Sequence, residues 1–269
     1  MYHGDNLPIL RQLPRESFDL IYIDPPFNTG REQVRLTTAA VPAPRGAKGS
    51  YAGFGGRYAR REVRGRASYA DSFADYLGFL RPRLQWARRL LSPRGSLFFH
   101  IDWREAAACR LLLEKVFGGR EHLLNEIIWA YDFGARPKRA WPRKHDTIYW
   151  FAKDPKDYIC HLERSDRLPY LAPKLAGEAK ARRGKTPTDV WWNTIVPTAG
   201  REKTGYPTQK PLAVLERIVK VHSEPDSTVL DFFAGSGTAG EAAAKHGRRY
   251  VLIDSSARAV QVMRRRLGL

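Results

Sequence analysis

The sequence predicts an α/β fold built on a doubly wound, parallel sheet with a small irregular insertion. Three observations support this prediction. Short apolar segments alternate with segments of helical spacing towards both ends of the chain. Two of the apolar segments, 18–24 and 228–231, stop at an aspartate just before a proline or glycine loop, as buried parallel strands do. Between these parts, residues 154–206 mix prolines, charges and short apolar pieces without a regular period.

The individual elements follow from apolar spacing and turn residues. Phe73, Leu77, Leu80 and Leu84 recur at helical spacing, and Pro211 stands where a helix can begin. The predicted strands are 18–24, 96–101, 126–131, 147–152, 228–231 and 250–254; the predicted helices are 72–91, 104–117, 211–222, 238–246 and the chain from 257 onward; and residues 92–95 are predicted to form a turn.

The charge of the chain is strongly positive. The 46 Lys and Arg residues against 28 Asp and Glu residues give a formal net charge of +18. This balance favours a polyanionic partner, nucleic acid first, over a basic surface that is merely solvated. Residues 31–67 hold nine Lys and Arg residues, two Glu residues and many glycines, so we expect a mobile basic loop there.

The sequence also indicates where the protein works. No apolar run is long enough to span a bilayer, and residues 1–20 lack the pattern of a secretion signal. Cys109 and Cys160 are widely spaced and match no metal-binding pattern. We therefore expect a reduced, cytoplasmic protein with no bound metal and no membrane partner.

A candidate cofactor loop follows the strand that ends at Asp231. Gly235 and Gly237 let the chain turn tightly and approach a ligand before a helix begins, although such glycines are equally typical of a plain turn. The acid Asp254 ends the next strand, where an acid typically binds a ribose. Asp231 suits an ammonium and repels a pyrophosphate, and no Lys-Ser/Thr pair follows the glycines. These features favour S-adenosylmethionine over NAD or a nucleoside triphosphate.

A candidate acceptor loop, Asp24-Pro25-Pro26-Phe27, follows the first strand. The lone pair of a base amino group is delocalised into the ring, so two hydrogen-bond acceptors outside the ring plane would make that nitrogen a better nucleophile. Asp24 can be one acceptor and the stiff Pro25 carbonyl the other, while Phe27 can stack on the base. In-line transfer then depends on positioning. A proline turn after a buried strand is the alternative.

These two loops resemble those of the DNA amino-methyltransferases, which methylate adenine N6 or cytosine N4. The acceptor loop precedes the cofactor loop, an order that resembles the β group of the family. The resemblance covers nearly the whole chain and implies a Rossmann-like sheet that binds S-adenosylmethionine. It implies an acceptor half at 1–153, a target-recognition region at 154–206 and a cofactor-binding half at 207–269.

The resemblance also implies roles for single residues. Asp5 would meet the adenine of the cofactor, with a helix N-cap as its alternative, and Asp254 would bind the ribose. Lys210, in the Gln-Lys-Pro segment, would neutralise the methionine carboxylate with help from Thr208. Residues 92–102 resemble the strand segment that flanks the target pocket. The complete candidate cofactor site is Asp5, Asp24, Thr208, Lys210, Asp231, Phe233, Gly235, Gly237, Thr238 and Asp254, with Phe233 and Gly235 along the methionine.

The choice of base stays open at this point. Asp24 and the segment Asn28-Thr29-Gly30 resemble adenine-specific enzymes, whereas Phe27 replaces the tyrosine most common in that group. Adenine N6 is therefore the leading target and cytosine N4 the alternative. More distant alternatives are an RNA or protein amide methyltransferase and an inactive DNA-binding module.

A base inside double-stranded DNA must be flipped out before it can be methylated. Backbone contacts are expected from the basic segments 31–67 and 134–145 and from the last helix. Taken alone, Trp141 is expected to pack, with stacking or wedging in DNA as its alternative, and Trp191 and Trp192 are expected in the core or a pocket wall. A homodimer and a separate restriction endonuclease are further partners that the family allows. The candidate DNA-binding residues are Arg136, Lys138, Arg139, Trp141, Arg143 and Lys144.

Overall fold

The computed structural model describes residues 1–53, 56–134, 136–197 and 200–269, with side chains in these ranges except at 31–38 and 65–70. The chain divides into two compact units. Unit 1 comprises Met1–Phe27 and Asp75–Leu269, and unit 2 is Asn28–Ala74.

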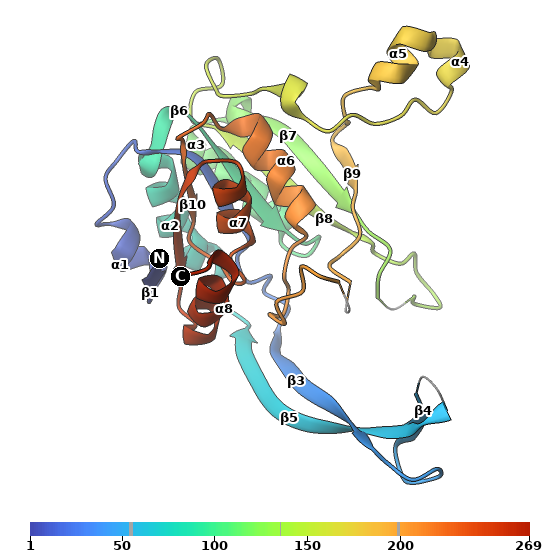
Figure 1. Ribbon diagram of the computed structural model, residues 1–269. Helices are drawn as coiled ribbons and strands as arrows, with labels where there is room; N and C mark the ends of the chain where they lie inside the picture. The colour runs from blue at the N-terminus through green and yellow to red at the C-terminus, as the bar shows by residue number, and fades with distance from the viewer. Residues whose placement is uncertain (54–55, 135, 198–199) are drawn as a thin grey trace. The chain divides into compact units, whose positions relative to one another are not determined.

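An eight-stranded sheet forms the centre of unit 1, with the strand order β1-β11-β10-β2-β6-β8-β7-β9 (Figure 1). The five strands from β1 to β6 in this order are parallel, β8 is antiparallel to both of its neighbours, and β9 is parallel to β7. The α/β fold with a mostly parallel sheet is therefore confirmed. The strands are β1 Tyr2–His3, β2 Phe18–Ile23, β6 Leu91–Ile101, β7 Leu123–Ala130, β8 His145–Ala152, β9 Val190–Trp192, β10 Thr228–Asp231 and β11 Arg249–Asp254.

Helices cover both faces of this sheet. Residues of α6 and α7 pack on the face that carries Leu20 and Tyr22 of β2. On the opposite face, Phe117 of α3 contacts Phe151 of β8, with ring centroids 5.1 Å apart. Because both faces are covered, β2 is buried without alternation from Leu20 to Ile23. The helices are α1 Asn6–Leu10, α2 Tyr76–Leu90, α3 Ala106–Phe117, α4 Pro173–Ala176, α5 Glu178–Arg183, α6 Leu212–His222, α7 Thr238–Lys245 and α8 Ala257–Leu267, and two 3-10 turns lie at Arg120–His122 and Leu162–Arg164.

Unit 2 corrects the prediction of a basic loop over 31–67. Its backbone forms a three-stranded antiparallel sheet of β3 (Arg31–Pro42), β5 (Tyr58–Asp71) and β4 (Ser50–Ala52). The two ends of the unit are tied by Asp71, whose carboxylate accepts hydrogen bonds from the Asn28 amide at 2.8 Å and the Thr29 hydroxyl at 2.6 Å. The long polar strands lack the apolar alternation that predicts a strand, which explains the wrong prediction.

Two smaller corrections concern unit 1. The predicted turn 92–95 lies inside β6 as an irregularity, because Phe18 pairs with Leu91 but Leu20 pairs with Ser96. The region 154–206 is largely irregular as predicted, yet it contributes β9 to the sheet. In β9, Trp191 is buried as expected, whereas the side chain of Trp192 is exposed.

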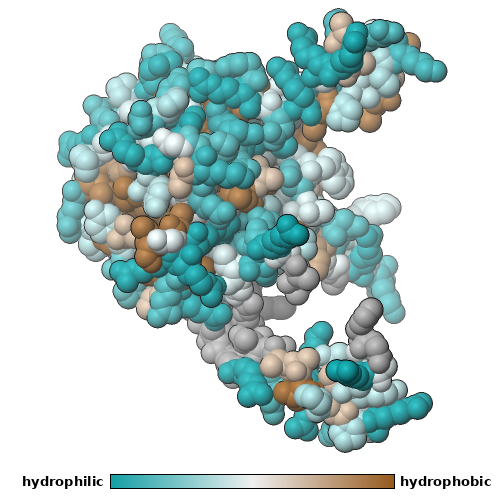
Figure 2. All heavy atoms as spheres, in the orientation of Figure 1, coloured by the Kyte–Doolittle hydropathy of each residue, from teal (hydrophilic) through white to brown (hydrophobic). Residues whose placement is uncertain are grey.

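The face drawn in Figure 2 is largely polar, because most of its atoms belong to hydrophilic residues. Among the helices of the described residues, none combines the length and apolar character that crossing a membrane requires.

Candidate active site

Four aspartates stand where neighbouring strands of the sheet end. Asp24 follows β2, Asp102 follows β6, Asp231 ends β10 and Asp254 ends β11. These four strands are parallel neighbours in the sheet, so their carboxyl ends lie at one edge. That edge is where open α/β sheets bind ligands. The fold therefore brings the two loops predicted from the sequence to one place.

The candidate cofactor loop is organised by Asp231 and Asp254. The carboxylate of the buried Asp231 accepts a hydrogen bond from the amide of Phe233 at 3.0 Å, and Asp254 accepts one from the amide of Gly235 at 2.7 Å. Burial raises the pKa of Asp231 well above its usual value, and the charges of Asp24 and Asp254 raise it further. A positively charged group at this position would relieve the cost of ionising Asp231.

Glycine is required in this loop for two reasons. Gly235 and Gly237 have φ angles of 50° and 76°, in the left-handed region. A Cβ atom at Gly237 would also lie 2.8 Å from Cγ of Met263 in α8. The loop thus turns in a way that only glycine permits while it packs directly on the last helix.

The Gln-Lys-Pro segment lies against the cofactor loop. The hydroxyl of Thr238, at the start of α7, donates a hydrogen bond to the carbonyl of Lys210 at 3.3 Å and accepts one from Arg266 at 2.9 Å. Thr208 has a positive φ of 55°, which turns the chain just before Lys210. The side chain of Gln209 is tied into the preceding turn by a 2.7 Å hydrogen bond to the Glu202 carbonyl.

Asp5 occupies the N-cap of α1. Its carboxylate accepts a hydrogen bond from the amide of Leu7 at 3.1 Å and forms a 2.9 Å ion pair with Arg83. The neighbouring Asn6 accepts from Arg83 at 2.6 Å and donates to the carbonyl of Phe232 at 2.7 Å. The capping alternative is therefore what the structure shows, and these bonds attach the Asp5 segment to the cofactor loop. Contact with an adenine stays a prediction.

Arg83 was not singled out from the sequence, because helical spacing identifies only the apolar residues of α2.

The candidate acceptor loop carries an unusual ion pair. Oδ2 of Asp24 lies 2.8 Å from Nζ of Lys210, and both side chains are largely buried. The same Nζ lies 4.8 Å from the ring centroid of Phe27. The Pro26 carbonyl accepts a 2.6 Å hydrogen bond from the hydroxyl of Tyr76, which holds the Pro-Pro turn. Lys210 thus reaches the acceptor loop, and its contact with the methionine carboxylate stays a prediction.

The second carboxylate oxygen of Asp24, Oδ1, is not engaged by Lys210. It is buried and has no hydrogen-bond partner among the residues that the structure describes. An unpaired buried carboxylate oxygen is costly, so the site favours a ligand that brings a hydrogen-bond donor. An amino group is such a ligand.

A buried histidine stands beside this oxygen. His100, in β6, is fully buried, and its Nδ1 lies 3.9 Å from Oδ1 of Asp24. Its Nε2 lies 3.1 Å from the carboxylate of Asp146, which also accepts a hydrogen bond from Tyr131. The sequence assigned the flanking segment 92–102 to the target pocket but did not single out His100 or Asp146. They meet only through the pairing of β6 with β8.

The predicted DNA-binding residues lie between β7 and β8. Arg136 pairs with Asp132 at 2.8 Å, and Lys144 donates a hydrogen bond to the carbonyl of Gly134 at 2.8 Å. Arg143 lies over the ring of Trp103, 3.9 Å from its centroid. Lys138 and Arg139 are exposed.

Trp141 is the exception to the expected packing. Its side chain is 92% exposed, so the structure contradicts a packing role within this chain.

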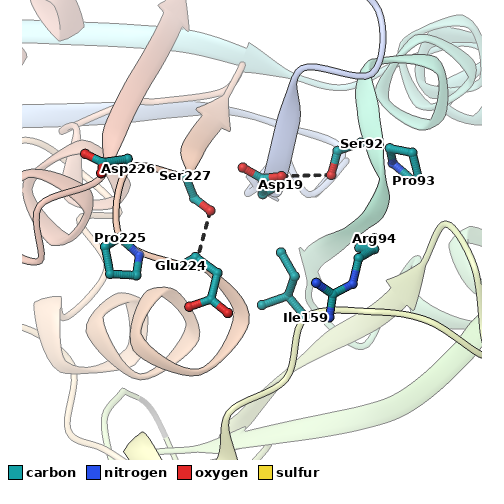
Figure 3. Close-up of a pocket in the computed structure, with 9 residues that line it drawn as sticks. All are labelled: Asp19, Ser92, Pro93, Arg94, Ile159, Glu224, Pro225, Asp226 and Ser227. Carbon is teal, nitrogen blue, oxygen red and sulfur yellow. Dashed lines mark hydrogen bonds between the residues drawn. The ribbon is translucent and has the colours of Figure 1, made fainter.

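A hollow elsewhere in unit 1 does not belong to this site. Figure 3 shows it at the amino ends of β2, β6 and β10, where Asp19 accepts a 2.8 Å hydrogen bond from Ser92. The carboxyl-end aspartates are absent from the residues that line it.

Comparisons with known proteins agree with this geometry. The model of the N6/N4 DNA methylase family matches residues 18–265. The type II methyltransferase M.ScaI of Streptomyces caespitosus is 27% identical over 268 residues, covering 94% of this chain and 76% of the relative. The DNA adenine methyltransferase YhdJ of Escherichia coli is 27% identical over 275 residues, covering 99% of this chain and 82% of the relative.

Solved structures share the fold. The PvuII DNA methyltransferase, which is cytosine-N4-specific, superposes with a TM-score of 0.66 at 17% identity, covering 99% of this chain and 85% of that one. The complex of M1.HpyAVI with S-adenosylmethionine gives a TM-score of 0.62 at 20% identity, covering 100% and 98%. The family predicted from the two loops is therefore confirmed: the chain belongs to the N6/N4 DNA methylase family.

Proposed function

We propose that this protein transfers a methyl group from S-adenosylmethionine to the N6 amino group of a flipped-out adenine in double-stranded DNA. The observation that carries the proposal is Asp24, whose Oδ2 is held by Lys210 while Oδ1 has no partner among the described residues. The relative named as a DNA adenine methyltransferase supports adenine. The likeness to a cytosine-N4-specific enzyme keeps cytosine N4 as the second candidate.

The residues at the acceptor loop fit an amino group. Oδ1 of Asp24 would accept one N–H hydrogen and the Pro25 carbonyl the other, which localises the nitrogen lone pair for attack. Phe27 would stack on the base. Lys210 keeps the carboxylate in one orientation, so the acceptor is in place before the base arrives.

The residues at the cofactor loop fit S-adenosylmethionine. The buried Asp231 gains a partner from an ammonium, and Asp254 retains acceptor capacity for the ribose hydroxyls while it holds the Gly235 amide. Lys210, with Thr208, would reach the methionine carboxylate, and Asp5 the adenine. When bound, the cofactor supplies an electrophilic methyl group; the protein positions it against the amino nitrogen.

The test is a labelling experiment in two arms. The protein, made in a host without DNA methyltransferases of its own, is incubated with methyl-labelled S-adenosylmethionine and mixed genomic DNA, and nucleosides are identified by mass spectrometry. We expect label in N6-methyladenine. Label in N4-methylcytosine would overturn the assignment of adenine as the target base. Cofactor binding without labelled DNA would overturn the assignment of DNA as the substrate. An Asp24→Asn variant in parallel controls for contaminating enzymes.

We propose that the segment 132–144 contacts DNA near the acceptor loop. It follows Tyr131 and ends two residues before Asp146; these two side chains are hydrogen-bonded to each other, and Asp146 also pairs with His100, whose Nδ1 lies 3.9 Å from Asp24. The exposed ring of Trp141 is free to stack on a base or between base pairs. A homodimer, a separate restriction endonuclease and a cytoplasmic location stay proposals from the family resemblance.

Removing charge from this segment should weaken DNA binding. In a Lys138→Gln/Arg139→Gln variant, the slope of log K against log salt should fall by about 1.8 if each side chain contacts a phosphate. Fluorescence anisotropy with duplex DNA at several salt concentrations measures the slope. The matched control is Lys115→Gln/Arg120→Gln, two exposed residues in the last turn of α3 and the 3-10 turn after it, which removes the same charge outside every segment proposed to contact DNA. Equal slopes for both variants would show that Lys138 and Arg139 do not contact DNA phosphates.

A further inference from the structure

An arginine stacks on an exposed tryptophan just beyond the end of β6. Cζ of Arg143 lies 3.9 Å from the ring centroid of Trp103, whose side chain is 43% exposed. A second guanidinium near this ring, that of Arg104 at 5.1 Å, is paired with the carboxylate of Asp102. Arg143 is exposed, and no carboxylate pairs with it among the residues that the structure describes. Its positive charge is therefore available to an anion.

Both the backbone and the side chain of Arg143 are held in place. The next residue, Lys144, anchors the backbone, because its carbonyl accepts a 2.9 Å hydrogen bond from the amide of Tyr131 and its ammonium donates to the carbonyl of Gly134 at 2.8 Å. The ring of Trp103 supports the guanidinium. A stacked guanidinium loses less freedom on binding than a mobile one, and its planar donors match a phosphate. The stack therefore prepares Arg143 to bind a phosphate.

The stack also lies close to the acceptor loop. Nδ1 of His100 is 3.9 Å from Oδ1 of Asp24, and Trp103 follows His100 by three residues. Three residues span at most about 11 Å. A strand of DNA advances about 3.4 Å for each nucleotide, so this span corresponds to about three nucleotides. The phosphates that flank a base bound at the acceptor loop are thus the anions nearest to Arg143.

We propose that Trp103 positions Arg143 to bind a DNA phosphate within about three nucleotides of the flipped base. The proposal rests on the proposed function. Extruding a nucleotide rotates the backbone at the target. A guanidinium that is already in place can bind the flanking phosphate through two parallel hydrogen bonds and stabilise the rotated backbone. Arg143 makes this contact, and Trp103 is a positioning residue that acts through Arg143.

The test is a double-mutant cycle of Arg143→Gln and Trp103→Ala, measured by fluorescence anisotropy with duplex DNA at several salt concentrations. Arg143→Gln should lower the slope of log K against log salt by about 0.9, the value for one phosphate contact. Trp103→Ala should weaken binding by about 2- to 5-fold, the value of an exposed cation–π contact. In the Arg143→Gln background it should cause no further loss. Trp103→Phe, which keeps an aromatic face, should restore most of the affinity.

Equal losses from Trp103→Ala in both backgrounds would overturn the proposal, because Trp103 would then act independently of Arg143. An unchanged salt slope in Arg143→Gln would overturn it as well.

The chain offers a matched control in a second arginine–tryptophan stack. Cζ of Arg89 lies 5.0 Å from the ring centroid of Trp86, in the part of α2 that leads into the opposite end of β6. Trp86→Ala should leave both the DNA affinity and the salt slope unchanged. A loss as large as that of Trp103→Ala would show a general effect of removing a surface tryptophan and would contradict the proposal.

The position of the phosphate is tested on duplexes built around the methylated base, which is located by sequencing the labelled DNA. In each duplex a neutral methylphosphonate replaces one phosphate. The original protein should lose affinity at a position within about three nucleotides of that base, and Arg143→Gln should be insensitive there. The absence of such a position would overturn the proposal. If the protein labels no DNA, the proposed function fails, while the cycle of Arg143 and Trp103 still decides whether this pair binds DNA.

Discussion

Replacing Asp24 by asparagine is expected to lower methyl transfer by about 10²- to 10³-fold, the loss typical of one preorganised polar group at a reacting centre. The structure gives a specific reason. Lys210 lies 2.8 Å from Oδ2 and will orient the amide with its oxygen towards the ammonium. The amide nitrogen then takes the position of Oδ1, so a donor faces the amino group of the base where an acceptor is required.

The measurement is single-turnover transfer to DNA together with cofactor affinity by calorimetry. Asp24 also belongs to the candidate cofactor site, but its proposed role in transfer is on the acceptor, so the loss should appear mainly in the rate constant and much less in the affinity. The matched control is Asp19→Asn at the opposite end of the same strand, where Asp19 accepts hydrogen bonds from Ser92 and the amide of Thr228. A rate for Asp24→Asn close to that of Asp19→Asn would exclude the proposed role.

The two loops could be predicted from the sequence because their signals are local. One apolar run stops at Asp24 before two prolines, and another stops at Asp231 before a loop with two glycines. Each pattern indicates, within a few residues, a buried strand followed by a proline or glycine turn. Parallel strands then place both turns at the same edge of the sheet. For the same reason the strand 228–231 was predicted with its observed bounds.

The features that were missed depend on contacts between distant residues. His100 and Asp146 meet because β8 runs antiparallel to β6, with His100 opposite Ile148, and no local pattern records that pairing. The Asp24–Lys210 ion pair likewise joins two residues that are far apart in the sequence. The sheet of unit 2 was missed because polar strands lack a buried apolar face, so the alternation that identifies a strand is absent.

Replacing Asp231 by asparagine should weaken cofactor binding and raise the stability of the protein. Loss of a charged hydrogen bond to the ammonium is expected to cost on the order of 10- to 100-fold in affinity. The amide can still accept from the Phe233 backbone, so the loop should keep its shape. The stability gain arises because burial, together with the charges of Asp24 and Asp254, makes ionisation of Asp231 unfavourable in the folded protein.

The sign of the pH dependence separates this expectation from a general effect of the substitution. The pKa of Asp231 is higher in the folded than in the unfolded state, so its contribution to stability is intact below about pH 4, its unfolded value, and is lost as the pH rises towards the folded value. Asp231→Asn should therefore match the original protein in acid and exceed it near neutral pH. Thermal denaturation at several pH values, without cofactor, measures this difference.

The matched control is Asp226→Asn, which replaces an exposed carboxylate before the same strand and should change neither stability nor affinity. A variant that loses stability at neutral pH, or that binds the cofactor normally, would show that Asp231 shapes the loop rather than receiving the ammonium.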